Sequence, residues 1–183
     1  MNELSLYLLD IVQNSIKAES KNIIINVTED ILADLLTIEI IDDGKGMNPE
    51  TLKKVTDPFF TSRLTRRVGL GIPIFKELCE TCLGSFQIES QEKKGTRLIG
   101  TLKYSNIDRP PMGNLVDTIY SLIINEEEVD IIYNHLFNNK KFTLNTKEIK
   151  QILDGVSFKQ IDIMIWIKDY IKEGLQFIKE EEL

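Results

Sequence analysis

The chain has 183 residues, enough for one well-packed domain or a domain with a small appendage, but too few for two full-size domains. Apolar residues make up 42% and charged residues 28%, a balance that is typical of a folded globular protein and excludes a disordered chain. The formal net charge of −7 argues against nucleic-acid binding through bulk electrostatics, so any anionic ligand must be met by a local site.

Targeting and cysteine signals are sparse. No apolar stretch approaches the roughly 20 residues of a membrane-spanning helix, and the first residues lack the basic start of a secretory signal, so we expect a cytoplasmic protein that does not bind membranes. Cys79 and Cys82 form a C-x-x-C pair, a spacing typical of a redox dithiol or half a metal site. The only histidine, His135, is distant, and two small buried side chains on one helix face are the simpler interpretation.

The first part of the chain alternates between helical and strand patterns. Apolar residues recur at helical spacing after Leu4, short β-branched runs follow, and Asn48-Pro49 is a typical helix start. In chain order we expect a helix over 4–18, strands over 23–27 and 36–41, a short helix from 49, a loop over 57–68, a helix that follows 69–71 and ends at Gly84, and strands over 85–89 and 96–104. This alternation predicts an α/β sandwich.

Two consecutive prolines, Pro110 and Pro111, mark the best candidate boundary, because proline interrupts both helices and strand ladders. We therefore expect a first region over 1–104 and a C-terminal α+β extension over 105–183. For the extension we expect a helix over 114–124, a hairpin of strands over 129–137 and 141–146, a short helix over 147–153 and a long amphipathic helix whose apolar side holds Ile163, Ile167, Tyr170, Ile171, Leu175 and Ile178.

The strongest chemical signal is the run 42–47, Asp-Asp-Gly-Lys-Gly-Met, at the end of the second strand. The alternation of that strand places Asp42 on its inward face, where a carboxylate needs hydrogen-bond donors. The amino group of adenine is such a donor, and because a carboxylate only accepts, the guanine carbonyl would be repelled and ATP preferred to GTP. The alternative is that Asp43-Gly44 only forms a hairpin turn, although the residues that follow start a helix.

A second signal is the stripe Asp10, Asn14, Lys17 on one side of the first helix. An Asn oxygen suits Mg²⁺, which takes its other ligands from water and substrate phosphates. Lys17 would balance phosphate charge, and Asp10 would orient or deprotonate an attacking water or hydroxyl. A polar stripe opposite an apolar one is also typical of any surface helix, so the stripe alone leaves both interpretations open.

A third signal, Gly69-Leu70-Gly71, precedes a helix, where backbone N–H groups and the helix dipole attract phosphate. It is neither a Walker A loop nor a dinucleotide fingerprint. Arg63, Arg66 and Arg67, just upstream, concentrate positive charge as a closing phosphate clamp would. A flexible helix entry with incidental arginines is the alternative.

Read in order, these pieces resemble the motifs of the GHKL superfamily of gyrase, heat-shock chaperone, histidine kinase and mismatch-repair ATPases. Residues 10–17 resemble the motif in which Asn binds Mg²⁺ and an acidic residue four positions earlier is the general base. Asp42-x-Gly44-x-Gly46 is similar to the adenine motif, with Gly46-Met47 beside the purine. Residues 57–62 resemble the phenylalanine-containing lid motif, 69–72 the phosphate loop, and Gly95-Thr96 the pair whose hydroxyl helps to hold adenine through water.

The resemblance implies a Bergerat-type fold over 1–104, a two-layer α+β sandwich with a mixed sheet covered by helices. It implies ATP and Mg²⁺ as cofactors, Asp10 as catalytic residue and Asn14 as metal ligand. The implied ATP-binding residues are Asn14, Lys17, Asp42, Gly44, Gly46, Met47, Phe60, Arg63, Arg66, Arg67, Gly69, Leu70, Gly71 and Thr96.

Several functions remain open. Asp10 stands where hydrolysing members of the superfamily carry Glu, one methylene longer, and Val68 where many kinases have a lid glycine. Because the sequence begins almost directly with the candidate ATP-binding helix, we expect a stand-alone domain without a phosphoacceptor domain. His135 lacks the acidic neighbour of an acceptor, so the resemblance favours anti-sigma-like kinases that phosphorylate a partner protein. An ATP-gated switch with slow hydrolysis and a non-catalytic sensor or scaffold are the alternatives. The partner is unidentified, a homodimer is left open, and the extension either docks a partner or only extends the core.

Overall fold

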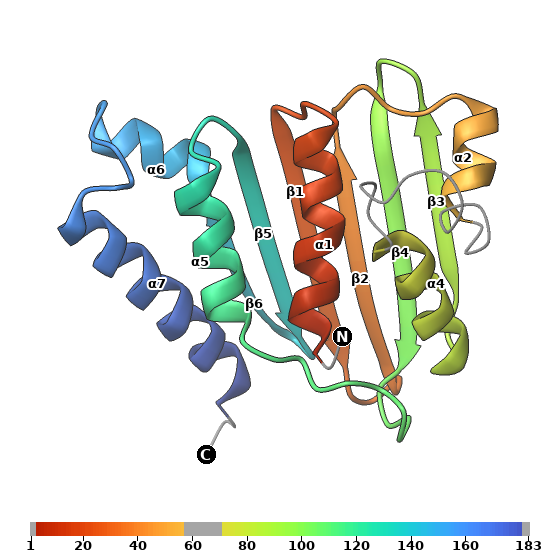
Figure 1. Cartoon of the computed structure of the whole chain (residues 1–183). Coiled ribbons are helices and arrows are strands. Elements are labelled where there is room, and N and C mark those ends of the chain that lie inside the picture. Colours follow the sequence, from red (N-terminus) through yellow and green to blue (C-terminus); the bar gives the residue numbers. More distant parts are fainter. Residues whose placement is uncertain (1–2, 57–70, 181–183) are drawn as a thin grey trace.

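The computed structural model describes residues 3–56 and 71–180. These residues form a six-stranded mixed sheet with helices packed on one face (Figure 1). In chain order the elements are α1 (Leu4–Lys17), β1 (Asn22–Asp30), β2 (Leu35–Asp42), α2 (Pro49–Val55), α4 (Gly71–Thr81), β3 (Phe86–Gln91), β4 (Gly95–Lys103), α5 (Leu115–Asn125), β5 (Asp130–Phe137), β6 (Lys140–Asn145), α6 (Thr146–Leu153) and α7 (Ile161–Lys179). The predicted two-layer α+β fold is confirmed, and the predicted elements within the described residues end within three residues of those observed.

The sheet has the strand order β3-β4-β2-β1-β5-β6. Four of its pairings are antiparallel, whereas β5 lies parallel to β1, with Asn22 opposite Asp130 and Glu29 opposite Phe137. The C-terminal strands therefore extend the sheet of the first region. A division of the chain after residue 104 stays a prediction.

The connection from β4 to α5 passes the start of α1. Glu3, the residue before this helix, supplies no side-chain cap, so the first N–H groups of the helix need other partners. The Pro111 and Met112 carbonyls accept hydrogen bonds from the Leu4 and Ser5 N–H groups, both at 2.9 Å. The proline segment thus closes the N-terminal end of the helix that carries the candidate site.

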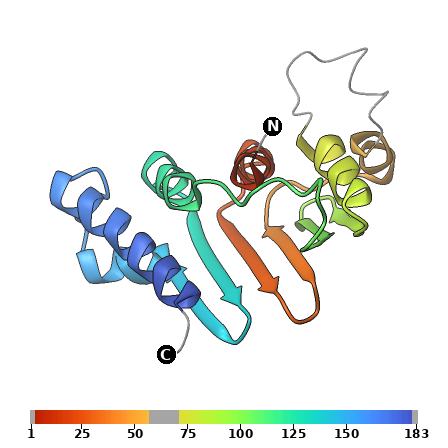
Figure 2. The same ribbon diagram turned by 90° about the horizontal axis from the view of Figure 1, so that it is seen from below.

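The core lies between the sheet and the helices, as the edge-on view in Figure 2 shows. Along β1 and β2 every second side chain is buried in the core, which is why each strand alternates in burial. Cys79 on α4 and Cys82, directly after this helix, are fully buried, and burial raises the pKa of the Cys79 thiol to about 12. A thiol with this pKa stays protonated at neutral pH, so the cysteines pack as small apolar side chains.

The other face of the sheet is tied together by polar side chains. Thr143 donates to Asn134 at 2.9 Å, Asn134 to Asn26 at 2.9 Å, and Asn26 to Glu39 at 2.7 Å. Arg97 completes this row, which we call the polar ladder, with a 2.8 Å bond from Nε to Glu39. The ladder crosses five neighbouring strands, from β6 to β4. Because each side chain is bonded to the next, the half-buried polar atoms on this face are satisfied without a second layer of helices.

A buried charged cluster joins the last helix to the sheet. Glu29 and His135 are almost fully buried, and His135 Nε2 lies 2.7 Å from Glu29 Oε1. Tyr133 bonds the other ring nitrogen of His135, while Tyr104 and Lys179 reach Glu29 at 3.1 and 3.3 Å. Burial alone would raise the pKa of Glu29, but the His135 hydrogen bond and the Lys179 ammonium outweigh it and hold the pKa below its ordinary value.

The lowered pKa of Glu29 predicts a pH-dependent contribution to stability. Ionised Glu29 stabilises the fold above its unfolded pKa, near 4.5, and this contribution is lost as the pH falls through the lower folded pKa. We expect Glu29→Gln to reduce the free energy of unfolding by about 2 kcal/mol at pH 7 and by clearly less at pH 3. Urea unfolding at the two pH values measures this, with exposed Glu77→Gln as control. A loss of equal size at both pH values would contradict the assignment.

Candidate functional site

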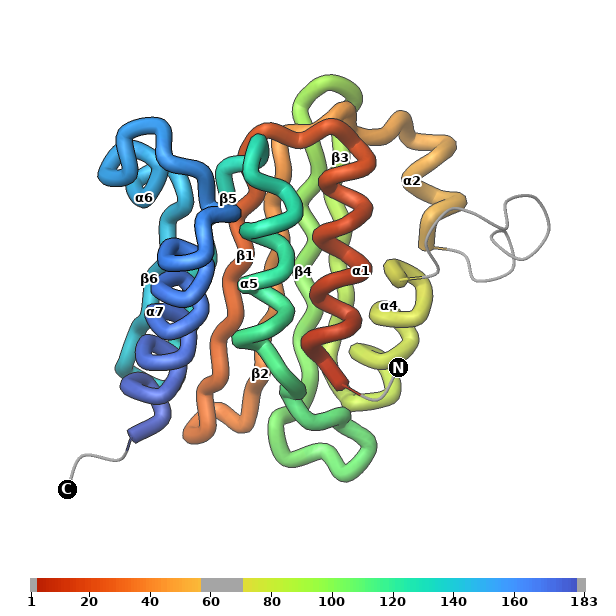
Figure 3. Tube along the Cα trace, turned by 60° about the vertical axis from the view of Figure 1, so that its left-hand side comes forward, coloured from red at the N-terminus to blue at the C-terminus, as the bar shows by residue number. Residues whose placement is uncertain are grey.

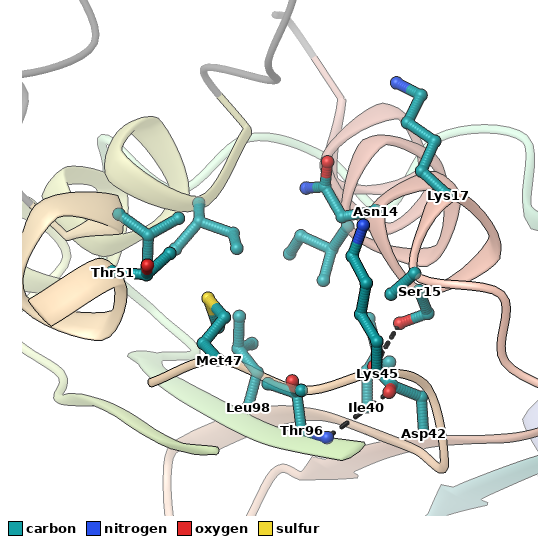
Figure 4. Close-up of a pocket in the computed structure, with 15 residues that line it drawn as sticks. Asn14, Ser15, Lys17, Ile40, Asp42, Lys45, Met47, Thr51, Thr96 and Leu98 are labelled. Atoms are coloured by element: carbon teal, nitrogen blue, oxygen red, sulfur yellow. Dashed lines mark hydrogen bonds between the residues drawn. The ribbon is translucent and has the colours of Figure 1, made fainter. Parts of the chain in front are cut away.

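A cavity of about 310 Å³ opens between α1, α2 and the ends of β2 and β4 (Figure 4). This volume is at the lower end of the range found for small-molecule pockets. The cavity is lined by Ile11, Asn14, Ser15, Lys17, Ala18, Ile40, Asp42, Lys45, Gly46, Met47, Thr51, Val55, Ile72, Thr96 and Leu98. Apolar and polar side chains contribute equally to this lining, and most of the polar groups lie along α1 and around Asp42.

Asp42 lies on the floor of the cavity and is 8% exposed. Its Oδ1 accepts hydrogen bonds from the Gly44 N–H at 2.9 Å and the Thr96 N–H at 3.2 Å. Its Oδ2 accepts from the Ser15 hydroxyl at 2.6 Å, drawn as a dashed line in Figure 4. A carboxylate has about four acceptor positions, so these three donors leave one position on Oδ2 for a further donor.

Two glycines allow the chain to pass this closely around Asp42. Gly95, with φ +97°, starts β4, and a Cβ there would lie 1.9 Å from the Asp42 carbonyl oxygen. Gly46, with φ +62°, follows β2, and a Cβ there would lie 1.9 Å from the Gln91 carbonyl oxygen. Both backbone conformations favour glycine. The turn after β2 and the start of β4 can therefore close the floor of the cavity together.

The polar stripe of α1 divides at the cavity. Asn14 points its amide into the cavity, whereas Lys17 extends away from Asp42 (Figure 4). The Asn14 Nδ2 atom is buried and finds no hydrogen-bond partner within residues 3–56 and 71–180. Asp10, one turn earlier, does not line the cavity and packs against the start of α4, where a Cβ on Gly71 would lie 3.0 Å from Asp10 Cβ.

The unpartnered atom of Asn14 is a donor, so it fits a ligand that brings acceptor oxygens, and the oxygen of the same amide is the atom that could bind a cation. Among the described residues, no three His, Cys, Asp or Glu side chains cluster so as to hold a metal ion. Magnesium bound by Asn14 would therefore need water and ligand oxygens to complete its coordination, which is the usual arrangement for this ion. The residues present fit Mg²⁺ that arrives with a phosphorylated ligand, and do not form a protein-only cage.

Of the residues expected to bind ATP, the structure brings Asn14, Lys17, Asp42, Gly46, Met47 and Thr96 together around the cavity. Gly44 and Gly71 do not line the cavity. The Gly44 N–H donates a hydrogen bond to Asp42, and Gly71 is the first residue of α4. Phe60, Arg63, Arg66, Arg67, Gly69 and Leu70 lie outside the described residues, as does the loop over 57–68, so their roles remain predictions.

Three polar side chains in the wall were missed by the sequence interpretation: Ser15, Lys45 and Thr51. Ser15 carried a readable signal, because it lies four residues after Ile11 and so places a hydroxyl on the inward stripe of the helix. Ser90 was also missed. It accepts from the Met47 N–H at 2.9 Å and lies 2.9 Å from the Thr96 hydroxyl, so it ties the turn after β2 to β4 behind the cavity.

Comparisons with known proteins agree with this geometry. The profile of the histidine kinase-, DNA gyrase B- and HSP90-like ATPases matches residues 2–106. The chain is 30% identical over 95 residues to sporulation kinase C of Bacillus subtilis, a match that covers 52% of this chain and 22% of the kinase. It is 36% identical over 92 residues to the anti-sigma F factor of Thermoanaerobacter sp., which covers 50% of this chain and 59% of that factor.

A solved structure, the N-terminal domain of a DNA repair protein, superposes with a TM-score of 0.56 at 15% identity, covering 79% of this chain and 53% of that chain. At this identity the likeness concerns the fold alone. No helix among the described residues is both long and apolar enough to cross a membrane. Because the family profile covers more than half of the sequence and includes every residue that lines the cavity, the chain belongs to the histidine kinase-, DNA gyrase B- and HSP90-like ATPase family.

Proposed function

We propose that this protein binds ATP with the adenine ring against Asp42, and that it transfers the γ-phosphoryl group to a partner protein. The observation that carries the proposal is the single open acceptor position on the Asp42 carboxylate, on a cavity floor that also carries apolar side chains such as Ile40 and Leu98. Adenine offers one amino group and an apolar ring, which is the combination that such a cavity accepts.

The walls support adenine rather than guanine. Ile40, Leu98 and Met47 provide apolar surface around the floor, where a purine ring loses contact with water. The amino group of adenine would donate to Asp42 Oδ2. The carbonyl oxygen of guanine at that place would face a carboxylate that has no proton to donate. The two oxygens would repel each other, and binding of guanine would be weaker.

The phosphate end would lie toward α1 and α4. Asn14 would hold Mg²⁺ together with phosphate oxygens, and the ion would neutralise charge on the phosphates. Lys45 lines the cavity and Lys17 lies at its rim, so both would meet negative charge near the opening. Asp10 faces the first residue of α4, at the place where the predicted phosphate loop joins the helix. There it would accept the proton of an attacking hydroxyl.

The relatives favour transfer to a protein, because those that match include a sporulation kinase and an anti-sigma factor. A cytoplasmic regulatory kinase is the function that agrees both with these relatives and with an ATP-binding cavity. A second candidate, an ATP sensor or switch without turnover, is favoured by two observations: Asp10 carries the shorter carboxylate, and it does not line the cavity.

The adenine assignment predicts that Asp42→Asn weakens ATP binding about 100-fold, because a charged hydrogen bond is lost and an amide nitrogen turns toward Ser15 or the ligand. The same change should narrow the preference for ATP over GTP, since the amide can donate to the guanine carbonyl. Isothermal titration with both nucleotides measures the two effects. Glu39→Gln, on the same strand but on the opposite face, is the matched control and should leave both affinities unchanged. If folded Asp42→Asn binds ATP as tightly as the parent chain, the assignment is wrong.

The kinase proposal predicts that Asp10→Asn keeps ATP binding but lowers phosphoryl transfer at least about 100-fold, because the proton acceptor is removed while the cavity wall stays intact. Asp10→Glu, which keeps the carboxylate, should retain transfer. Incubation of the full chain and a cell extract with γ-labelled ATP shows whether the label reaches another protein or free phosphate. If no protein is labelled and hydrolysis is the same for the parent chain and Asp10→Asn, the sensor or switch is supported instead.

A further inference from the structure

The last helix of the described chain, α7, has a second face whose large side chains are only partly covered. Its inner face buries Ile167, Ile171, Leu175 and Ile178. Its outer face carries Trp166, Tyr170 and Phe177, whose side chains are 45%, 39% and 59% exposed. Residues spaced by four and seven positions lie along one side of a helix, so the three rings form a continuous row. Large exposed aromatic side chains in a row are typical of a protein-binding surface.

The rings of this row are held in place. Trp166 and Tyr170 stack with ring centroids 5.5 Å apart and planes within 13°, and Tyr170 packs edge-on against Phe142 of β6 at 5.4 Å. The Lys140 ammonium lies 5.7 Å from the ring of Phe177. Side chains that are already ordered lose little conformational freedom when a partner binds, which favours association.

A row of carboxylates runs beside the rings. Asp162, Asp169, Glu173 and Glu180 are all exposed and, at spacings of seven, four and seven residues, fall on the same side of the helix. Within the described residues, Asp162, Asp169 and Glu173 make neither an ion pair nor a side-chain hydrogen bond. The charge is therefore free to meet cations from outside. We call the aromatic row and these carboxylates together the α7 ridge.

We propose that the α7 ridge docks a basic amphipathic helix of a partner protein. Aliphatic side chains of such a helix would cover the three rings, while flanking Lys or Arg side chains would meet the carboxylates. A second copy of this chain would bring an identical acidic row to the contact. An anionic membrane or a nucleic acid would be repelled by it as well. Charge thus selects a basic protein segment.

The ridge lies at the opposite end of the molecule from the nucleotide cavity. α7 packs on β5 and β6, at one edge of the sheet, whereas the cavity lies between α1, β2 and β4 toward the other edge (Figure 3). Docking therefore leaves the opening of the cavity uncovered. The inference goes beyond the proposed function and does not require nucleotide binding.

The test uses the full chain and a synthetic helical peptide of Leu and Lys at amphipathic spacing, without tryptophan. Trp166 is the only tryptophan of the sequence, so its emission reports directly on the ridge. We expect a saturable blue shift of Trp166 emission, with an affinity that falls as salt is added. A peptide with Glu in place of Lys should give no shift. Absence of a shift with the basic peptide would overturn the proposal.

Variants separate docking on the ridge from attraction by the net charge of the chain. We expect Asp169→Asn combined with Glu173→Gln to lower the affinity for the basic peptide about tenfold, because two charge contacts are lost. Glu77→Gln combined with Glu80→Gln removes the same charge from the exposed side of α4 and should leave the affinity unchanged. Equal weakening by both pairs would show that binding follows net charge alone and would overturn the proposal.

Two further measurements bear on the occupant. Phe177→Ser should lower the affinity for the basic peptide. The helix content measured by circular dichroism should stay the same, because the ring of Phe177 is mostly exposed. Analytical ultracentrifugation of the chain without peptide should show a monomer. A dimer that Phe177→Ser dissociates would assign the ridge to a second copy and overturn the proposal.

Discussion

The hydrogen bonding of one inward carboxylate, Asp42, constrains the end of the molecule that holds the cavity. Asp42 takes its three donors from three separate parts of the chain: the hydroxyl of Ser15 on α1, the backbone of Gly44 after β2, and the backbone of Thr96 on β4. A buried carboxylate without these donors would cost several kcal/mol. The helix, the turn and the strand must therefore meet in one register, and the cavity is the space that remains when they do.

Much of this arrangement could be predicted from local patterns in the sequence. Strand parity alone places Asp42 inward, Asn48 caps α2 through the Thr51 N–H as its position before proline suggests, and the helical spacing of Ile167 to Ile178 gives the buried face of α7. The parallel pairing of β5 with β1 could not be read in the same way, because about one hundred residues separate the two strands and no local signal encodes their contact.

The same limit applies to side chains whose neighbours come from elsewhere in the chain. Periodicity puts Asp10 and Asn14 on one side of α1, but how the helix is rotated against the sheet and α4 decides that only Asn14 enters the cavity. Glu29 and His135 each interrupt an otherwise apolar face of a strand. Neither position shows from its own segment that the other supplies its buried partner, 106 residues away.

The polar ladder has a mechanical consequence for a sheet with helices on one face only. Three of its bonds join side chains that stand opposite one another on neighbouring strands, and Arg97 reaches diagonally to Glu39. A slip of any of these strands by one residue would therefore break at least one bond and turn that strand's side chains over. Arg97, at one end, directly follows the Thr96 that bonds Asp42, and Thr143, at the other, lies on the strand beneath α7. The strands in between should resist sliding past one another and move as one rigid unit. This fixes the distance between the cavity and α7.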